Sequence, residues 1–140
     1  MAALSKGERV DAVLRGEAPD RAPVSAWRHF LRDERDPEVL ARASLRHFQE
    51  FDWDWLKINP RATYYAEAWG NRYDYDHYAG PWPKQVGGPI STPADLNRLR
   101  CVHPTAGVLG EQLALVQHIR AGLGEAQHQF QRLARQVDLG

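Results

Sequence analysis

The spacing of apolar residues in the first half of the chain predicts two helices that alternate with two extended segments. A capping-box pair, Ser5 and Glu8, precedes a helical apolar stripe that ends at Gly16. A short apolar run at 24–27 then predicts a buried strand. Asp36 and Pro37 open a second helix, and the run 55–58 predicts a second strand. Strand, helix and strand in this order favour a parallel α/β sheet.

The second half of the chain has a different pattern. Residues 61–88 are rich in tyrosine, tryptophan and glycine and read as a long irregular segment, in which 71–78 alternates enough to be one arm of a hairpin. Further helices are predicted to begin at Thr92-Pro93, ending near Leu99, and at Pro104-Thr105, closed by glycines at 122 and 124. In 125–140, apolar residues recur at helical spacing, so a third sheet strand is not predicted there.

Composition narrows the class of protein. Lys and Arg number 18, as do Asp and Glu, so bulk attraction to nucleic acid or to an anionic membrane is not expected. The single cysteine, Cys101, excludes an internal disulfide and a multi-cysteine zinc site. No apolar run approaches the roughly 20 residues that span a bilayer, and the N-terminus lacks a signal-peptide core. We therefore expect a soluble, cytoplasmic protein.

Polar residues follow each predicted strand. Arg28 and Arg32 lie four residues apart after the first strand, and Asn59 ends the second. In parallel barrels the chemistry lies at this end of the strands. Arginine binds carboxylates through its planar, permanently charged fork, so the pair indicates an anionic ligand. A surface role also stays open, with both arginines paired to acidic residues at 33–36 and Asn59 serving as a turn residue before Pro60.

Three stretches carry a family resemblance: K-G-E-R-V-D-A-V-L-R-G-E-A-P-D-R-A-P-V from Lys6, R-H-F-L-R from Arg28, and F-D-W-D-W-L-K-I-N-P from Phe51. From about Ser5 to Gly124 the chain resembles the uroporphyrinogen decarboxylase family, in particular its uroporphyrinogen-III decarboxylase-like branch. The resemblance implies an α/β fold, the (β/α)₈ TIM barrel. Such a barrel needs about 250 residues, so residues 1–124 would form its N-terminal part and 125–140 a divergent tail.

The same resemblance assigns roles to the polar residues. In the family, two arginines at the spacing of Arg28 and Arg32 bind the substrate's carboxylates. Small residues separate the family's two arginines, whereas this chain has Phe30 and Leu31 in their place. The family's catalytic aspartate falls on Asn59, which accepts hydrogen bonds but brings no negative charge. The implied function is carboxy-lyase chemistry on tetrapyrrole acetate side chains in porphyrin biosynthesis, without cofactor or metal. A tetrapyrrole or other polycarboxylate is the expected ligand, and we expect the lone chain to be inactive.

Several alternatives stay open. The chain is either the product of a truncated or frame-disrupted gene or a shortened protein with a true C-terminal helix. It is a decarboxylase-like protein, a fragment of a cobamide-dependent methyltransferase relative whose zinc ligands lie in the absent later half, or a non-catalytic module that another chain completes. Barrel edges left exposed would favour self-association.

Other residues carry weaker signals. Lys57 is a possible base or electrophile but more often such a lysine extends to solvent, and His29 is either a proton carrier or a surface residue. Cys101 and His103 are too few to hold zinc, which takes three or four protein ligands. The aromatic residues of 61–88 either cover a flat macrocycle or pack on one another as a lid.

Overall fold

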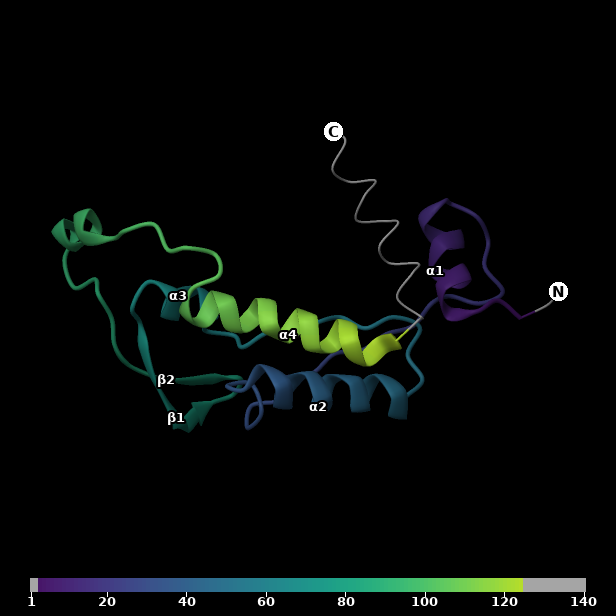
Figure 1. Cartoon of the computed structure of the whole chain (residues 1–140), viewed down its shortest axis with the longest axis horizontal. Helices are drawn as coiled ribbons and strands as arrows, with labels where there is room; N and C mark the ends of the chain where they lie inside the picture. The colour runs from purple at the N-terminus through teal and green to yellow at the C-terminus, as the bar shows by residue number, and fades with distance from the viewer. Residues whose placement is uncertain (1–2, 125–140) are drawn as a thin grey trace.

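The computed structural model describes residues 3–124. The elements in chain order are α1 (Lys6–Leu14), α2 (Pro37–Glu50), α3 (Tyr64–Ala68), β1 (Arg72–Ala79), β2 (Trp82–Gly87), the 3₁₀ helix η1 (Pro93–Arg98) and α4 (Gly107–Leu123). The helices α2 and α4 lie side by side, with α1 at one end of the pair and the β1–β2 hairpin at the other (Figure 1). The predicted helix in 125–140 lies outside the described residues.

Local capping sets where the first two long helices begin, as the sequence predicts. The Ser5 hydroxyl accepts the Glu8 N–H at 3.3 Å, and the Glu8 carboxylate accepts the Ser5 N–H at 2.9 Å. The Asp36 carboxylate accepts the backbone N–H groups that follow it in α2 at 2.8 and 3.0 Å, and Pro37 occupies the first turn. These bonds satisfy backbone donors that a helix start leaves unpaired.

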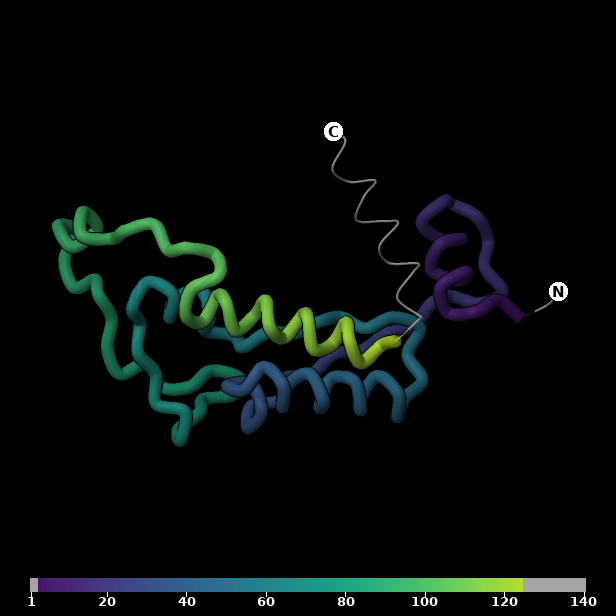
Figure 2. Tube along the Cα trace, viewed as in Figure 1, coloured from purple at the N-terminus to yellow at the C-terminus, as the bar shows by residue number. Residues whose placement is uncertain are grey.

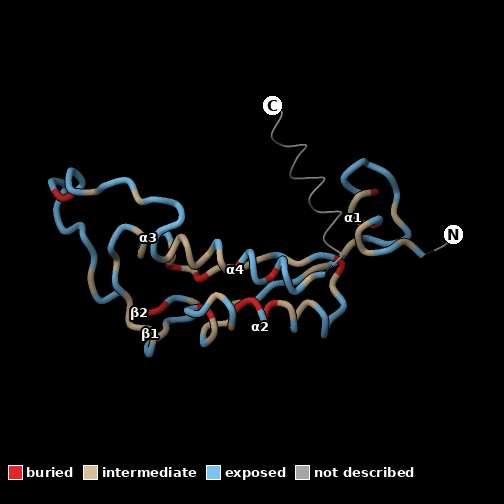
Figure 3. The backbone as a smooth tube through the Cα atoms, in the orientation of Figure 1, coloured by how far each residue is buried: buried red, intermediate tan, exposed pale blue. Residues whose placement is uncertain are grey.

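The hydrophobic core lies between α2 and α4. Leu40 and Ala41 of α2 meet Leu115 and Ile119 of α4, and all four are buried (Figure 3). The two helices run in the same direction along the chain trace (Figure 2). They approach closely at Gly122, where an added Cβ would lie 2.3 Å from Leu45 Cδ1. Gly122 therefore lies within α4 and serves packing, whereas Gly124 ends the helix with a positive φ of 63°.

The two predicted strands, 24–27 and 55–58, are the main correction to the sequence-based expectation. Both segments are extended, but neither forms a regular strand ladder. At Val24 the N–H donates to the Asp54 carboxylate at 2.7 Å, so at this position a side chain takes the place of a neighbouring backbone carbonyl. The sheet that the described residues contain is the antiparallel pair β1–β2.

The two extended segments nevertheless run side by side in the same direction. The Asp54 N–H donates to the Val24 carbonyl at 2.9 Å, and the Ser25 hydroxyl donates to the Trp55 carbonyl at 2.7 Å. Further along, the Nδ2 atom of Asn59 lies 3.5 Å from the carbonyl oxygen of Arg28. Helix α2 connects the two segments along the chain. Leu56 and Ile58 of the second segment pack against the hydrophobic core between α2 and α4. The arrangement is a parallel crossover without a regular sheet, and the complete (β/α)₈ barrel stays a prediction.

The aromatic stretch 61–88 is more ordered than its composition indicates. It contains α3 and the antiparallel hairpin, with pairs such as Tyr73 with Gln85 and Ala79 with Trp82. Strand β1 confirms the predicted hairpin arm. The register is interrupted between Asp74 and Tyr78, so β1 bends away from its partner at a bulge. The predicted helix after Thr92 is the 3₁₀ helix η1, begun by a Thr92–Asp95 capping box.

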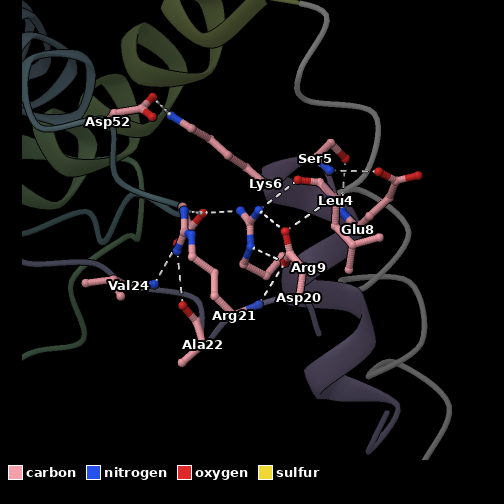
Figure 4. Close-up of polar contacts among 11 residues, drawn as sticks. Leu4, Ser5, Lys6, Glu8, Arg9, Asp20, Arg21, Ala22, Val24 and Asp52 are labelled. Atoms are coloured by element: carbon pink, nitrogen blue, oxygen red, sulfur yellow. Dashed lines mark hydrogen bonds and ion pairs between the residues drawn. The ribbon is translucent and has the colours of Figure 1, made fainter. Parts of the chain in front are cut away.

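A network of charged side chains holds α1 against the two extended segments (Figure 4). Arg9 binds Asp20 through two bonds of 2.8 and 2.9 Å and Asp54 through a third of 2.6 Å. Arg21 binds the same Asp54 carboxylate at 2.5 and 2.9 Å. Burial opposes the charge of Asp54, but the hydrogen bonds from Arg21, the backbone and Arg9 outweigh it and keep the Asp54 pKa below its ordinary value.

We predict that Leu115→Ala destabilises the chain by about 3 kcal/mol, because it removes a fully buried side chain and leaves a cavity between α2 and α4. The matched control is Leu113→Ala on the same helix, where 45% of the side chain is exposed and the expected loss is below about 1 kcal/mol. Urea unfolding followed by circular dichroism measures both. Equal losses in the two variants would contradict the core described above.

Candidate carboxylate-binding site

A small pocket lies between α2 and the two extended segments. Its polar lining residues come from all three parts of the chain: Arg28, Ser44, His47, Trp53, Lys57 and Asn59. The remaining lining side chains are apolar or aromatic. The enclosed volume is about 10 Å³, roughly that of one water molecule, so only a small group of a larger ligand enters it.

Asn59 is held at the pocket by the first extended segment. Its Nδ2 atom lies 3.2 Å from His29 Nδ1 and 3.5 Å from the Arg28 carbonyl oxygen. The side-chain amide of Asn59 therefore directs its N–H donors toward Arg28 and His29 of the first extended segment. Within residues 3–124 no hydrogen bond engages its Oδ1 atom, which remains an acceptor for an N–H group of a ligand.

Arg28 presents its positive charge at the same pocket. Its guanidinium lies over the ring of Phe30, 5.3 Å from the centroid, and the residue is exposed. None of the ion pairs in the described part of the chain involves Arg28. The surface pairing that the sequence left open, with an acidic residue at 33–36, is not formed. Among the described residues no carboxylate occupies the N–H donors of the Arg28 guanidinium, so these donors can bind an anion.

Arg32 lies apart from the pocket, in the turn 31–35. The two arginines were expected to point the same way if their turn were helical. The chain is instead extended at Arg28 and turns only from Phe30, whose carbonyl accepts the Asp33 N–H at 2.7 Å. A spacing of four residues therefore does not place the two side chains on one face. Arg32 is exposed and has no ion-pair partner among residues 3–124.

The hairpin holds the turn that carries Arg32. The Tyr78 hydroxyl donates to the Leu31 carbonyl and to Glu34, both at 3.1 Å. Glu34 is only 3% exposed, and burial raises the pKa of its carboxyl group despite the hydrogen bond from Tyr78. Burial likewise raises the pKa of Tyr78 to about 12. One tyrosine of the aromatic stretch thus fixes the turn beside the candidate site.

A buried ion-pair cluster, which the sequence did not indicate, fixes the base of the hairpin. Arg61 is 4% exposed and donates to Glu67 of α3 and to Glu111 of α4, both at 2.9 Å. The Tyr75 hydroxyl of β1 donates to the same Glu67 and lies 2.9 Å from the Thr63 hydroxyl. Arg61 and Glu67 are close in sequence, but nothing in the sequence points to Glu111. The cluster joins three elements, and its one cation, Arg61, is already paired with two carboxylates of the chain.

The sequence reasoning also missed the inner side of the pocket. Ser44 and His47 follow Leu40 along α2 at the spacing of one helical face, and this face packs inward. The sequence signal that could have shown this is that Ser44 and His47, both polar, occupy helix positions where the spacing predicts apolar side chains. Trp53 follows the end of α2, and its sequence position carried no such signal.

The remaining candidates have local partners. Lys57 places its ammonium 4.0 Å from the ring centroid of Trp27, and His29 meets the same ring edge-on at 5.5 Å. His103 lies 2.7 Å from the Thr105 hydroxyl, and Cys101 is exposed. In the described part of the chain, no three His, Cys, Asp or Glu side chains gather as a metal site requires.

Comparisons of the chain with protein-family models, with curated proteins and with solved structures give no match. The family resemblance therefore stays a prediction. Among residues 3–124 there is no helix of the length and apolarity needed to cross a membrane.

We predict that Glu34→Gln raises the melting temperature at pH 7.5. The native state binds the Glu34 proton more tightly than the unfolded state, so this residue's contribution is largest at low pH and is lost as pH rises through its raised pKa. The amide keeps an acceptor for Tyr78 without burying a charge. Melts of both proteins between pH 7.5 and 4 measure the difference, which should vanish on acidification.

The control is Glu50→Gln at the exposed end of α2, whose effect on the melting temperature at pH 7.5 should be clearly smaller than that of Glu34→Gln because Glu50 is not buried. A Glu34→Gln protein that is less stable than the wild type at pH 7.5 would show that the charge itself stabilises the turn.

Proposed function

We propose that this chain recognises the carboxylate groups of a tetrapyrrole, as a uroporphyrinogen decarboxylase-like protein of the cytoplasm. One observation carries the proposal: residues 31 positions apart, Arg28 and Asn59, meet at one pocket, with Nδ2 of Asn59 3.5 Å from the Arg28 carbonyl. The resemblance assigns carboxylate binding to the first and the position beside the substrate's ring nitrogens to the second.

The chemistry of these two residues fits the two kinds of polar group that uroporphyrinogen carries. The exposed Arg28 guanidinium offers paired donors to an acetate side chain. The Oδ1 atom of Asn59 offers an acceptor to a pyrrole N–H. The macrocycle is far larger than the pocket, so we propose that one carboxylate arm enters and the ring lies on the open side. In this proposal Arg32, on the neighbouring turn, binds a second arm.

Binding and catalysis are separable in this proposal. Decarboxylation of an acetate arm proceeds through a protonated, positively charged pyrrole ring, and loss of carbon dioxide then returns electrons to that ring. An aspartate beside the ring would stabilise the cation, whereas the neutral amide of Asn59 does so only weakly. We therefore propose that the chain binds such a substrate without turning it over.

A second candidate, a non-catalytic module that another chain completes, is favoured by the exposed aromatic residues of the two extended segments. Trp27 is 50% exposed and Trp55 is 38% exposed. Exposed tryptophans that lie together are typical of surfaces that a partner or a ligand covers. Both candidate functions use the carboxylate pocket. They differ in whether any chain of the assembly carries out catalysis.

We predict that Arg28→Ala weakens binding of uroporphyrin I roughly ten- to a hundredfold, because a hydrogen bond to a charged partner contributes about 1.5–3 kcal/mol. Arg32→Ala should weaken it less, since Arg32 lies outside the pocket. Fluorescence titration of the porphyrin at two salt concentrations measures the affinities. The effect of Arg28→Ala should persist at the higher salt concentration.

The matched control is Arg46→Ala, which removes the same charge from an exposed position of α2 that does not line the pocket. Its effect should be small and should disappear as the salt concentration rises. If Arg46→Ala and Arg28→Ala weaken binding equally, the porphyrin is attracted by net charge and the assignment of Arg28 fails.

We also predict that the wild-type chain forms no coproporphyrinogen III from uroporphyrinogen III. The assay is anaerobic incubation followed by chromatography of the oxidised products, with heat-inactivated protein as the blank. Product formation clearly above this blank would contradict the role given to the neutral Asn59.

A further inference from the structure

We propose that the inner end of the pocket is a binding site for a single carboxylate group, built from the indole N–H of Trp53 and the imidazole Nε2 of His47 beside Arg28. The site would hold one arm of the ligand discussed above, so its biological meaning rests on the proposed function. Its existence as a carboxylate site is testable without any tetrapyrrole.

The first argument comes from unpaired polar atoms. In the described part of the chain, the buried side-chain nitrogen and oxygen atoms without a hydrogen-bond partner are His47 Nε2, Trp53 Nε1 and Gln112 Oε1. His47 and Trp53 both line this pocket, whereas Gln112 does not. The indole nitrogen is only ever a donor, and a buried donor without an acceptor is costly. The cost is removed when an acceptor enters the pocket.

The second argument is continuity between these atoms and the surface. The rings of Trp53 and His47 lie 6.1 Å apart, and Phe30 meets His47 edge-on at 6.0 Å. Arg28 covers the same Phe30 at 5.3 Å. The donors of Arg28 at the rim, the indole N–H of Trp53 and the His47 Nε2 atom, which donates when it carries the proton, therefore belong to one connected cluster. Its aromatic walls lower the local polarity and strengthen hydrogen bonds to a charged group.

The third argument is the sign of the charge. The pocket lining contains Arg28 and Lys57 but no aspartate or glutamate. A site of cations and N–H donors selects an anion over a cation or a neutral amide. The enclosed volume of about 10 Å³ admits one small group and leaves the rest of the ligand outside. One oxygen of a carboxylate at the end of a flexible arm fits this volume, with the rest of the group at the pocket mouth, and inorganic phosphate shares its anionic oxygens.

The experiment follows the indole N–H resonance of Trp53 in ¹⁵N-labelled full-length chain, assigned by its loss in Trp53→Phe. Sodium acetate is titrated against acetamide and inorganic phosphate at constant ionic strength. We expect acetate to move the Trp53 resonance saturably and acetamide to leave it in place. Phosphate is expected to act more weakly than acetate, since the pocket admits only a small group.

Variants test the assigned donors. Trp53→Phe and His47→Phe should each lower the affinity for acetate roughly tenfold, measured through chemical-shift changes of the neighbouring backbone amides. The matched control is Trp82→Phe, which removes an exposed indole of β2 outside the pocket and should leave the affinity unchanged. If Trp53→Phe fails to fold by circular dichroism, the Trp53 resonance is assigned by elimination, through Phe substitutions of the other four tryptophans, and the acetate titration of the wild type then decides alone.

The outcomes separate this proposal from the proposed function. Saturable acetate binding at Trp53 together with no porphyrin binding upholds the site and removes the tetrapyrrole. Porphyrin binding that depends on Arg28 but not on Trp53, without acetate binding, upholds the function and overturns the site. A Trp53 resonance that acetate does not move, or that phosphate moves at lower concentration than acetate, also overturns the carboxylate assignment.

Discussion

The buried carboxylate of Asp54 is the interaction on which the position of the candidate site depends. It accepts hydrogen bonds from Arg9 of α1, from Arg21 and from the backbone N–H of Val24, and its own N–H returns a bond to the Val24 carbonyl. These bonds join both extended segments at their beginnings. Four residues after Val24 and five after Asp54, the Arg28 carbonyl lies 3.5 Å from the Asn59 side chain, so the register of the two segments is kept to within one residue. A carboxylate that does not itself line the pocket thus aligns the residues that do.

The side chains of these segments differ in exposure, and the difference bears on where a ligand would bind. Leu56 and Ile58 pack on the core between α2 and α4. Trp27 and Trp55 also line the pocket but are partly exposed, and the Lys57 ammonium lies over Trp27. The pocket opens beside α2, where aromatic walls surround the unpaired indole N–H of Trp53, the unpaired Nε2 atom of His47 and the positive charge of Arg28. An anion is the ligand that these donors lack.

The charged networks contribute in different ways to binding and to structure. Arg9 and Arg61 are buried and fully engaged with carboxylates of the chain, so they hold elements together. Arg28 is exposed and lies against an aromatic ring instead. Only an arginine of the second kind has donors to offer an incoming carboxylate. Burial and pairing, and not residue type, therefore separate structural from candidate binding arginines in this protein.

The sequence by itself determined the features that depend on a few neighbouring residues. Capping at Ser5 and Asp36, the β1 arm and the start of η1 follow from local hydrogen bonds, so they were predictable. Tertiary structure decided the rest. Asp54 replaced a backbone partner of Val24, neither predicted strand formed, and the turn that begins at Phe30 separated Arg28 from Arg32. His47 and Trp53 are near neighbours at the end of α2, but they meet Arg28 and Phe30 only because α2 packs back on the first extended segment, and no local pattern encodes that contact.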